Sequence, residues 1–109
     1  MKSPVPQISA TELNEWRASN KPHQLIDVRE IHEVQVSNIG GIHIPMSHCL
    51  SRASELRRDV PVVIHCRSGA RSSAVVSALR DRAGLDNAVN LAGGITAWAT
   101  EVDPELEVA

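Results

Sequence analysis

The 109-residue chain contains neither tyrosine nor phenylalanine, and its large aromatic side chains are limited to two tryptophans. A core must therefore be built from Val, Ile, Leu, Ala and Met together with Trp16 and Trp98. Strong charge of one sign is also absent, because the formal net charge is −2 with the histidines neutral. Such a balance gives no electrostatic reason to expect a nucleic acid or a membrane surface as partner. Any cationic site must be local.

Cysteines are few, and long apolar runs are missing. Two cysteines do not make a disulfide framework, so we expect reduced thiols and a cytoplasmic protein. No apolar run could span a bilayer, and residues 1–6 lack the apolar segment of a signal peptide. With 42% hydrophobic and 22% charged residues, the composition is ordinary for a globular protein. We expect one domain over residues 1–109 with a substantial core.

Short β-branched runs alternate with helical patterns along the chain. The segment from Ser9 to Glu12 has the form of a capping box, which predicts a helix that ends near residues 20–22. Apolar residues at helical spacing predict another helix over 71–83, which Gly84 closes. Strands are expected at residues 5–8, 25–28, 42–44, 62–66 and 88–91.

Three further helices complete the alternation. One is expected at 29–36, one from Ser47 or Ser51 with Leu50, Ala53 and Leu56 on its apolar face, and one after the Gly93–Gly94 turn. Strands that alternate with helices predict an α/β fold, with a central parallel sheet of about five strands and helices on both faces. Ligands of such sheets bind beyond the carboxyl ends of the strands.

The most informative stretch is residues 65–72, which read His-Cys-Arg-Ser-Gly-Ala-Arg-Ser. Cys66 stands where an expected strand ends, and an expected helix follows the loop. Backbone N–H groups of such a loop converge on one point, and the helix N-terminus adds positive potential there. Arg67 and Arg71 add two cationic side chains. We therefore expect the Cys66 thiol to ionise more readily than a free thiol and to act as a nucleophile.

Other reactive side chains have simpler interpretations. Cys49 shares an apolar helical pattern with Leu50 and Ala53, so we expect it to pack in the core rather than act as a redox partner. The five histidines have no metal-ligand spacing, and neither a metal site nor a cofactor is expected. Ser68 and Ser72 either cap the helix after the loop or belong to the anion cradle, and the sequence leaves both open.

Four stretches, taken in order, resemble the rhodanese-like domain family of sulfurtransferases. Each is weak alone, but together they follow the order of the family and cover nearly the whole chain. The ending 98–104 is also similar to the C-terminal rhodanese domain of some adenylating enzymes of molybdopterin and thiamine biosynthesis. The stretches are LIDVRE at 25–30, IHIP at 42–45, VIHCRSGARS at 63–72 and NLAGGITAW at 90–98.

The resemblance implies a rhodanese-like fold and a ping-pong transfer of sulfane sulfur. Cys66 would attack an anionic donor such as thiosulfate, hold the sulfur as a persulfide and pass it to a thiophilic acceptor. That acceptor is cyanide in vitro and a thiol or a sulfur-carrier protein in the cell. The resemblance also implies that Asp27 pairs with a loop arginine, with Arg29 beside it, whereas from the residues alone Asp27 equally suits the N-cap of the next helix. By position, the cradle around Cys66 is formed by Arg67, Ser68, Gly69, Ala70, Arg71 and Ser72.

Two other functions fit parts of this pattern. A strand followed by a cysteine-to-arginine loop also serves phosphatases, but the four residues between Cys66 and Arg71 are one fewer than in those loops. The wider loop surrounds a phosphate, whereas the shorter one suits a single extra sulfur atom. A docking module without turnover typically lacks the cysteine, which is present here. The expected partners are a small anionic sulfur donor and a sulfur-carrier protein or adenylating enzyme, with no nucleic acid and no membrane.

Overall fold

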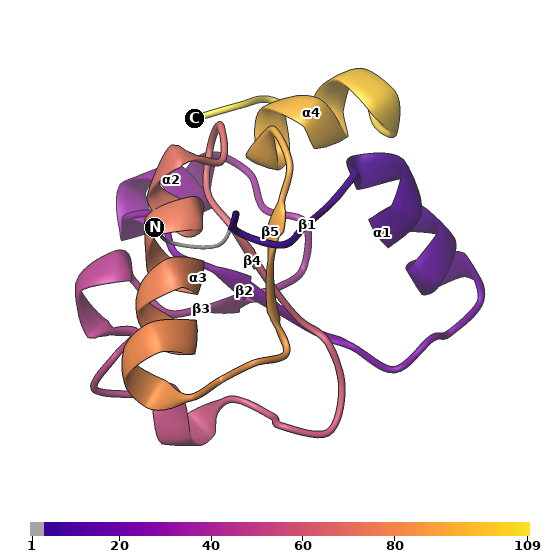
Figure 1. The fold of residues 1–109 in the computed structure, drawn as a ribbon. Coiled ribbons are helices and arrows are strands. Elements are labelled where there is room, and N and C mark those ends of the chain that lie inside the picture. Colours follow the sequence, from indigo (N-terminus) through magenta and orange to yellow (C-terminus); the bar gives the residue numbers. More distant parts are fainter. Residues whose placement is uncertain (1–3) are drawn as a thin grey trace.

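The β-branched runs form the strands of one five-stranded sheet in a computed structural model that describes residues 4–109 (Figure 1). All strand pairings are parallel, and the spatial order β1-β5-β4-β2-β3 places β4 at the centre. The strands are β1 (Gln7–Ile8), β2 (Gln24–Asp27), β3 (Ile42–His43), β4 (Val62–His65) and β5 (Ala88–Leu91).

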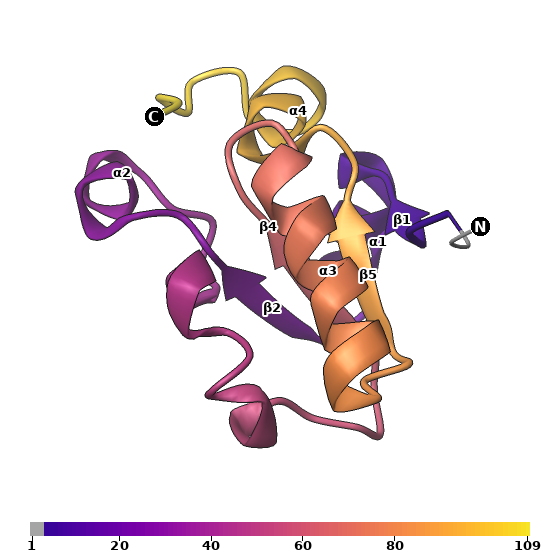
Figure 2. The same cartoon turned by 60° about the vertical axis from the view of Figure 1, so that its left-hand side comes forward.

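Helices cover both faces of this sheet, which confirms the predicted α/β architecture. Figure 2 shows α3 on one side of the strands and α1 on the other. Among the described residues, no helix is long and apolar enough to cross a membrane. The helices are α1 (Ala10–Ala18), α2 (Ile31–Val36), α3 (Ala70–Ala83) and α4 (Gly94–Glu101), with two 3-10 turns, η1 (Met46–His48) and η2 (Ala53–Glu55).

Two apolar cores lie on opposite faces of the sheet, and the alternation of side chains along β4 separates them. Val62 and Ile64 join the core that contains α3, whereas Val63 joins the core that contains α1 and α4. Trp98 is 5% exposed in the second core, as predicted, whereas Trp16 is only half-buried at its edge. Aliphatic side chains and one tryptophan thus fill the interior of a protein without Tyr or Phe.

The predicted helix ends agree with the structure where the sequence carries a capping signal. The Ser9 hydroxyl accepts the N–H of Glu12 at 3.0 Å, and the Glu12 carboxylate accepts the N–H of Ser9 at 3.4 Å. Gly84 ends α3 with a φ of +64°. Residues 1–3, which are part of the segment read as lacking a signal peptide, lie outside the described residues.

Several other boundaries differ from the prediction by one or two residues. The first strand begins at Gln7 rather than at Val5, and α2 begins at Ile31 because Glu30 still has an extended backbone with ψ of 157°. Strand ends fray into the loops that follow them, so hydropathy locates them less sharply than a cap locates a helix. The structure has β2 at 24–27 rather than 25–28, β3 at 42–43 rather than 42–44, β4 at 62–65 rather than 62–66, and α3 from 70 rather than 71.

The predicted helix from Ser47 or Ser51 is wrong. The chain forms the two separate turns η1 and η2 there, and Arg52 between them leaves the helical conformation with φ of −107° and ψ of 15°. Leu50 is 40% exposed, although the pattern places it on the buried face. Packing against the core therefore overrides the helical spacing in this segment.

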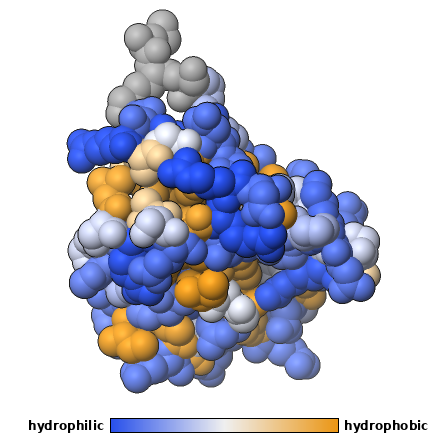
Figure 3. Space-filling model, turned by 90° about the horizontal axis from the view of Figure 1, so that it is seen from below, coloured by the Kyte–Doolittle hydropathy of each residue, from blue (hydrophilic) through white to orange (hydrophobic). Residues whose placement is uncertain are grey.

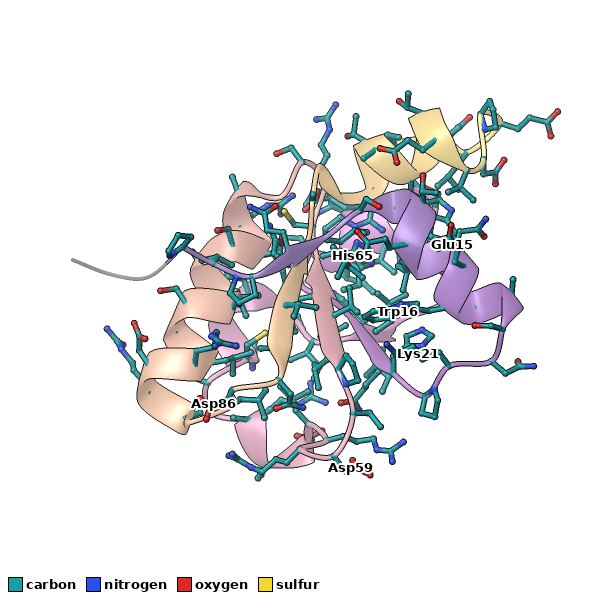
Figure 4. The ribbon with its side chains drawn as sticks, turned by 45° about the vertical axis from the view of Figure 1, so that its right-hand side comes forward. Glu15, Trp16, Lys21, Asp59, His65 and Asp86 are labelled. Atoms are coloured by element: carbon teal, nitrogen blue, oxygen red, sulfur yellow. The ribbon has the colours of Figure 1, made fainter. Side chains whose placement is uncertain are left out.

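The carboxyl ends of β2, β4 and β5 lie at one edge of the sheet because the strands are parallel. Figure 4 shows His65 in the interior near this edge, whereas Asp59 and Asp86 lie at the opposite end of the strands. The surface seen from below is largely hydrophilic, with hydrophobic residues in small separate patches (Figure 3). Cys66 follows the carboxyl end of β4, and ligands of parallel α/β sheets bind beyond such strand ends.

Candidate active site

The loop that carries Cys66 connects β4 to α3. Gly69 immediately precedes α3 and has a φ of +103°, a conformation that glycine adopts without strain. A Cβ at this position would also lie 3.3 Å from the backbone nitrogen of Gly93. Glycine therefore allows the loop to turn tightly above the cysteine.

Three hydrogen-bond donors converge on the Sγ atom of Cys66. The N–H of Gly69 donates to it at 3.1 Å, the N–H of Ser72 at 3.4 Å and the Ser72 hydroxyl at 3.3 Å. The cysteine itself is 1% exposed. Neither Ser68 nor Ser72 caps α3, because the N-cap residue is Gly69. The Ser72 side chain thus lies in the cradle, while Ser68 and Ala70 are exposed at its rim.

Hydrogen bonds favour the thiolate form of Cys66. Burial alone raises the pKa of this thiol because a buried anion loses its hydration. The Ser72 hydroxyl and the N–H groups of Ser72, Gly69 and Ser68 outweigh burial and hold the pKa of Cys66 below its ordinary value. The sequence prediction of a depressed pKa thus has a structural cause, although it lies in these hydrogen bonds more than in the arginine charges.

Replacing Ser72 with alanine is expected to raise the pKa of Cys66. The thiolate fraction then reaches its plateau at higher pH, so the pH profile of Cys66 alkylation shifts upward relative to the unmodified protein. Alkylation rates measured against pH, with the product located by peptide mapping, give the midpoint directly. Ser73→Ala is the matched control, because Ser73 is the adjacent serine of α3. Its contact with the loop is made by its backbone N–H, which donates to the Gly69 carbonyl and is kept in alanine. Equal midpoints in the two variants would contradict this role of Ser72.

A buried amide supports the cradle from β5. Asn90 is 3% exposed, and its Oδ1 accepts the Ser72 hydroxyl at 2.5 Å, so Asn90 and the Sγ atom of Cys66 share the single hydroxyl proton of Ser72. Its Nδ2 donates to the Gly69 carbonyl at 3.3 Å. A polar residue within a buried strand needs such partners. That rule is the sequence signal that could have identified Asn90, which the sequence prediction omitted.

The N-terminus of α4 supports the loop from outside (Figures 1 and 2). The N–H groups of Ile95 and Thr96 donate to the carbonyl oxygens of Cys66 and Arg67, both at 3.0 Å. These loop carbonyls are turned toward α4, while the N–H groups of Gly69 and Ser72 face the sulfur. Gly94 makes this approach feasible, because a Cβ there would lie only 2.5 Å from the Cys66 carbonyl oxygen. Gly94 therefore has a function at the site beyond the turn predicted from sequence.

The two loop arginines have different surroundings. Arg71 donates two hydrogen bonds to the Glu33 carboxylate of α2, at 2.7 and 2.8 Å. These bonds lower the pKa of Glu33 to about 2. The Arg67 side chain is exposed and has no ion-pair partner within residues 4–109. The sequence did not identify Glu33, because 38 positions separate it from Arg71 and only the fold brings them together.

Asp27 pairs with Arg29 rather than with a loop arginine, which corrects the implication of the resemblance. The two side chains are buried, and Nη2 of Arg29 lies 2.8 Å from Oδ2 of Asp27. Burial raises the pKa of Asp27, but the hydrogen bonds from Arg29 bring it below its ordinary value. Arg29 also donates to the carbonyls of Ser37 and Ala109. The buried pair thus connects the end of β2 to the residue after α2 and to the last residue of the chain. Glu30, rather than Asp27, is the N-cap of α2.

His65 lies beside this buried pair. Its Nε2 is 3.6 Å from Oδ2 of Asp27 and has no hydrogen-bond partner in the described part of the chain. Burial lowers the pKa of His65, so the ring is neutral at neutral pH and Arg29 is the cation that keeps Asp27 ionised. Residues 4–109 hold no group of three or more side chains suited to a metal ion.

Cys49 occupies a different environment from Cys66. It is 3% exposed, and its thiol donates to the Ile44 carbonyl at 3.5 Å, so the predicted core packing is confirmed. Burial raises the pKa of Cys49 to about 11. Cys49 lines a hollow of about 470 Å³ between η1 and α3, to which no residue of the 66–69 loop contributes. Both cysteines are free, but only Cys66 is surrounded by donors that favour its anion.

The fold and the site together define a parallel α/β domain with a cysteine in a loop whose hydrogen-bond donors converge on its sulfur. The family model of the Rhodanese-like domain matches residues 9–101. The chain therefore belongs to the rhodanese-like domain family, which confirms the resemblance noted in the sequence. A rhodanese-like domain protein from Staphylococcus aureus has the same fold, with a TM-score of 0.80, 31% identity and coverage of 96% of this chain and 99% of that one.

Two curated relatives illustrate the contexts in which such domains occur. MoeZ of Mycobacterium tuberculosis, an adenylyltransferase/sulfurtransferase by name, is 36% identical over 102 residues, which cover 91% of this chain and 26% of MoeZ. A sulfurtransferase of Allochromatium vinosum is 36% identical over 96 residues, which cover 87% of this chain and 89% of that protein. The chain thus spans about a quarter of the length of MoeZ but most of the length of the smaller relative.

Proposed function

We propose that this protein is a sulfurtransferase that carries sulfane sulfur on Cys66. The main support for this proposal is that hydrogen-bond donors of Gly69 and Ser72 converge on the Sγ atom of Cys66. These donors favour a thiolate and can stabilise the negative charge of a second sulfur atom attached to it. Membership of the rhodanese-like domain family and the 36% identity to a sulfurtransferase support the same reaction class.

The reaction consists of two displacements at sulfur. In the first, the Cys66 thiolate attacks the outer sulfur of a donor such as thiosulfate, an S–S bond to Sγ forms, and the S–S bond of the donor breaks. Sulfite leaves with the bonding electron pair, and Cys66 becomes a persulfide anion. In the second, a thiophilic nucleophile attacks the outer sulfur and releases the thiolate. Cyanide, the acceptor in vitro, leaves as thiocyanate, so atoms and charges balance in both steps.

The charges around the loop favour an anionic donor. Arg67 is exposed at the rim and has no carboxylate partner among residues 4–109, so a negatively charged leaving group meets this cation as it departs, while Arg71 at the start of α3 is paired with Glu33. In the cell, we propose a thiol or a sulfur-carrier protein as the acceptor, either alone or delivered by an adenylating enzyme. MoeZ, whose name combines both activities, supports that partnership. The reaction requires a reduced Cys66, and both cysteines are free in the structure. We therefore also propose a cytoplasmic setting, which keeps thiols reduced.

Phosphate-ester hydrolysis fits the loop less well. The N–H groups of Gly69 and Ser72 already lie 3.1 and 3.4 Å from Sγ itself. A tetrahedral phosphate needs donors for three oxygen atoms at a greater distance from the cysteine. The loop is therefore better matched to one additional sulfur atom.

Incubation with thiosulfate in the absence of an acceptor is expected to leave a persulfide on Cys66, because a ping-pong carrier holds the group between its two half-reactions. Intact-protein mass spectrometry should show the gain of one sulfur atom, and cyanide or dithiothreitol should remove it. Peptide mapping should place the sulfur on Cys66, with Cys49 unmodified as the internal control. Turnover with no added sulfur, or sulfur found on Cys49 alone, would refute the carrier mechanism and favour a docking module.

A further inference from the structure

The ion pair between Arg71 and Glu33 places a fixed anion beside the cysteine loop. The carboxylate accepts two hydrogen bonds from the guanidinium, at 2.7 and 2.8 Å. Its Oε1 atom also accepts the N–H of Glu30 at 3.0 Å, as part of the capping box of α2. The Glu33 side chain is only 12% exposed, against 36% for Arg71. Glu33 is therefore held in place by its own helix as well as by the arginine.

This anion remains charged under all ordinary conditions. The hydrogen bonds from Arg71 hold the pKa of Glu33 at about 2, and those to Glu33 raise the pKa of Arg71. Arg71 lies in the first turn of α3, directly after the cysteine loop, and the charge of Cys66 also raises the pKa of Arg71. A donor that approaches Cys66 thus meets an arginine whose charge is already balanced by a carboxylate.

We propose that Glu33 is a specificity-determining residue whose carboxylate lowers the reactivity of the site toward dianionic sulfur donors relative to donors with one negative charge. The proposal rests on the sulfurtransferase function proposed above. A dianion such as thiosulfate is repelled by the carboxylate and must compete with it for Arg71. Because Coulomb energy is proportional to the charge of the donor, the penalty is about twice as large for a dianion as for a monoanion. Arg67, which is exposed and unpaired in the described residues, then supplies the cation that the donor meets without competition.

The Glu33→Gln variant tests this selection. Glutamine keeps an oxygen that accepts the N–H of Glu30, so the cap of α2 is preserved while the negative charge is removed. The donors are thiosulfate, a dianion, and an alkyl thiosulfonate, a monoanion that gives up the same outer sulfur and releases a sulfinate. Mass spectrometry measures the rate of persulfide formation per unit concentration of each donor. We expect the thiosulfate-to-thiosulfonate rate ratio to rise about threefold to fivefold, the scale of a partly exposed ion pair, with most of the change in KM.

Two further variants isolate the charge of Glu33. Glu55→Gln breaks another two-bond Arg–Glu pair, with Arg52 at 2.8 and 2.9 Å, on η2 and outside the loop, and should leave the ratio unchanged. Glu33→Asp keeps the charge and should keep a ratio near that of the unmodified protein. Thermal unfolding of each variant verifies that it is folded.

The outcomes separate this proposal from the function on which it rests. If the thiosulfate-to-thiosulfonate rate ratio of Glu33→Gln equals that of the unmodified protein or is lower, Glu33 only positions Arg71. That result overturns the selection by charge. The same holds if Glu33→Asp shows the same increase as Glu33→Gln, because the loss of charge then cannot be the cause. Absence of a persulfide on the unmodified protein with either donor refutes the sulfurtransferase function instead.

Discussion

Replacing Cys66 with serine is expected to abolish sulfur transfer, because a serine hydroxyl is not ionised at neutral pH and cannot carry sulfane sulfur. The loss should amount to several orders of magnitude in kcat/KM for thiosulfate and cyanide. The loop itself should remain intact, since a serine Oγ can still accept the N–H groups of Gly69 and Ser72. Thiocyanate release is the measurement, with thermal unfolding as the check that the variant is folded.

Cys49→Ser is the matched control for this prediction. The substitution is chemically identical and also buried, but Cys49 faces the Ile44 carbonyl and has a pKa raised to about 11. A serine hydroxyl can donate to the same carbonyl, so we expect near-normal turnover with at most a modest loss of stability. Comparable thiocyanate release by Cys66→Ser and the unmodified protein would reject Cys66 as the nucleophile. An equal loss of turnover in both variants would indicate a defect of the fold rather than of the chemistry.

The sequence predicts most of the fold because its signals are local. The Ser9 capping box, Gly84 at the end of α3 and the β-branched run before Cys66 each mark one boundary. Their order is enough to specify a parallel sheet with helices on both faces. The same locality places the cysteine at the start of a glycine-containing loop, where its neighbours in sequence are also its neighbours in space.

The parts that sequence does not predict depend on contacts between distant segments. Glu33 and Gly94 reach the loop from α2 and α4, and no local pattern links them to Cys66. Asn90 stands out as a polar residue in a buried strand, but the sequence does not say which groups it binds. The opposite error concerns Asp27, for which a partner two residues away is available in Arg29. Asp27 ends β2 and Arg29 lies just beyond it, so the two side chains are close enough to pair directly, and the loop arginine is left without this partner.

Replacing Gly94 with alanine is expected to destabilise the protein strongly and to impair the site. The residue has a φ of +57°, and its Cβ would lie 2.5 Å from the Cys66 carbonyl oxygen and 2.6 Å from that of Arg67. Both obstacles are backbone atoms, so no side chain can rotate away. The positive φ costs about 1–2 kcal/mol, and the forced displacement of the loop adds about 1–3 kcal/mol. Denaturant unfolding measures the sum.

Gly84→Ala separates the two contributions to this loss. Gly84 also has a positive φ, +64°, but a Cβ there meets nothing within 4 Å. Its loss of unfolding free energy should therefore reflect the backbone conformation alone, and its Cys66 alkylation profile should stay normal. In Gly94→Ala, the clash displaces the loop from α4. The loop N–H groups then no longer point at the Cys66 sulfur, and we expect the pKa of Cys66 to rise. If the two variants lose equal stability and Cys66 titrates alike in both, then contact with α4 does not shape the cysteine loop.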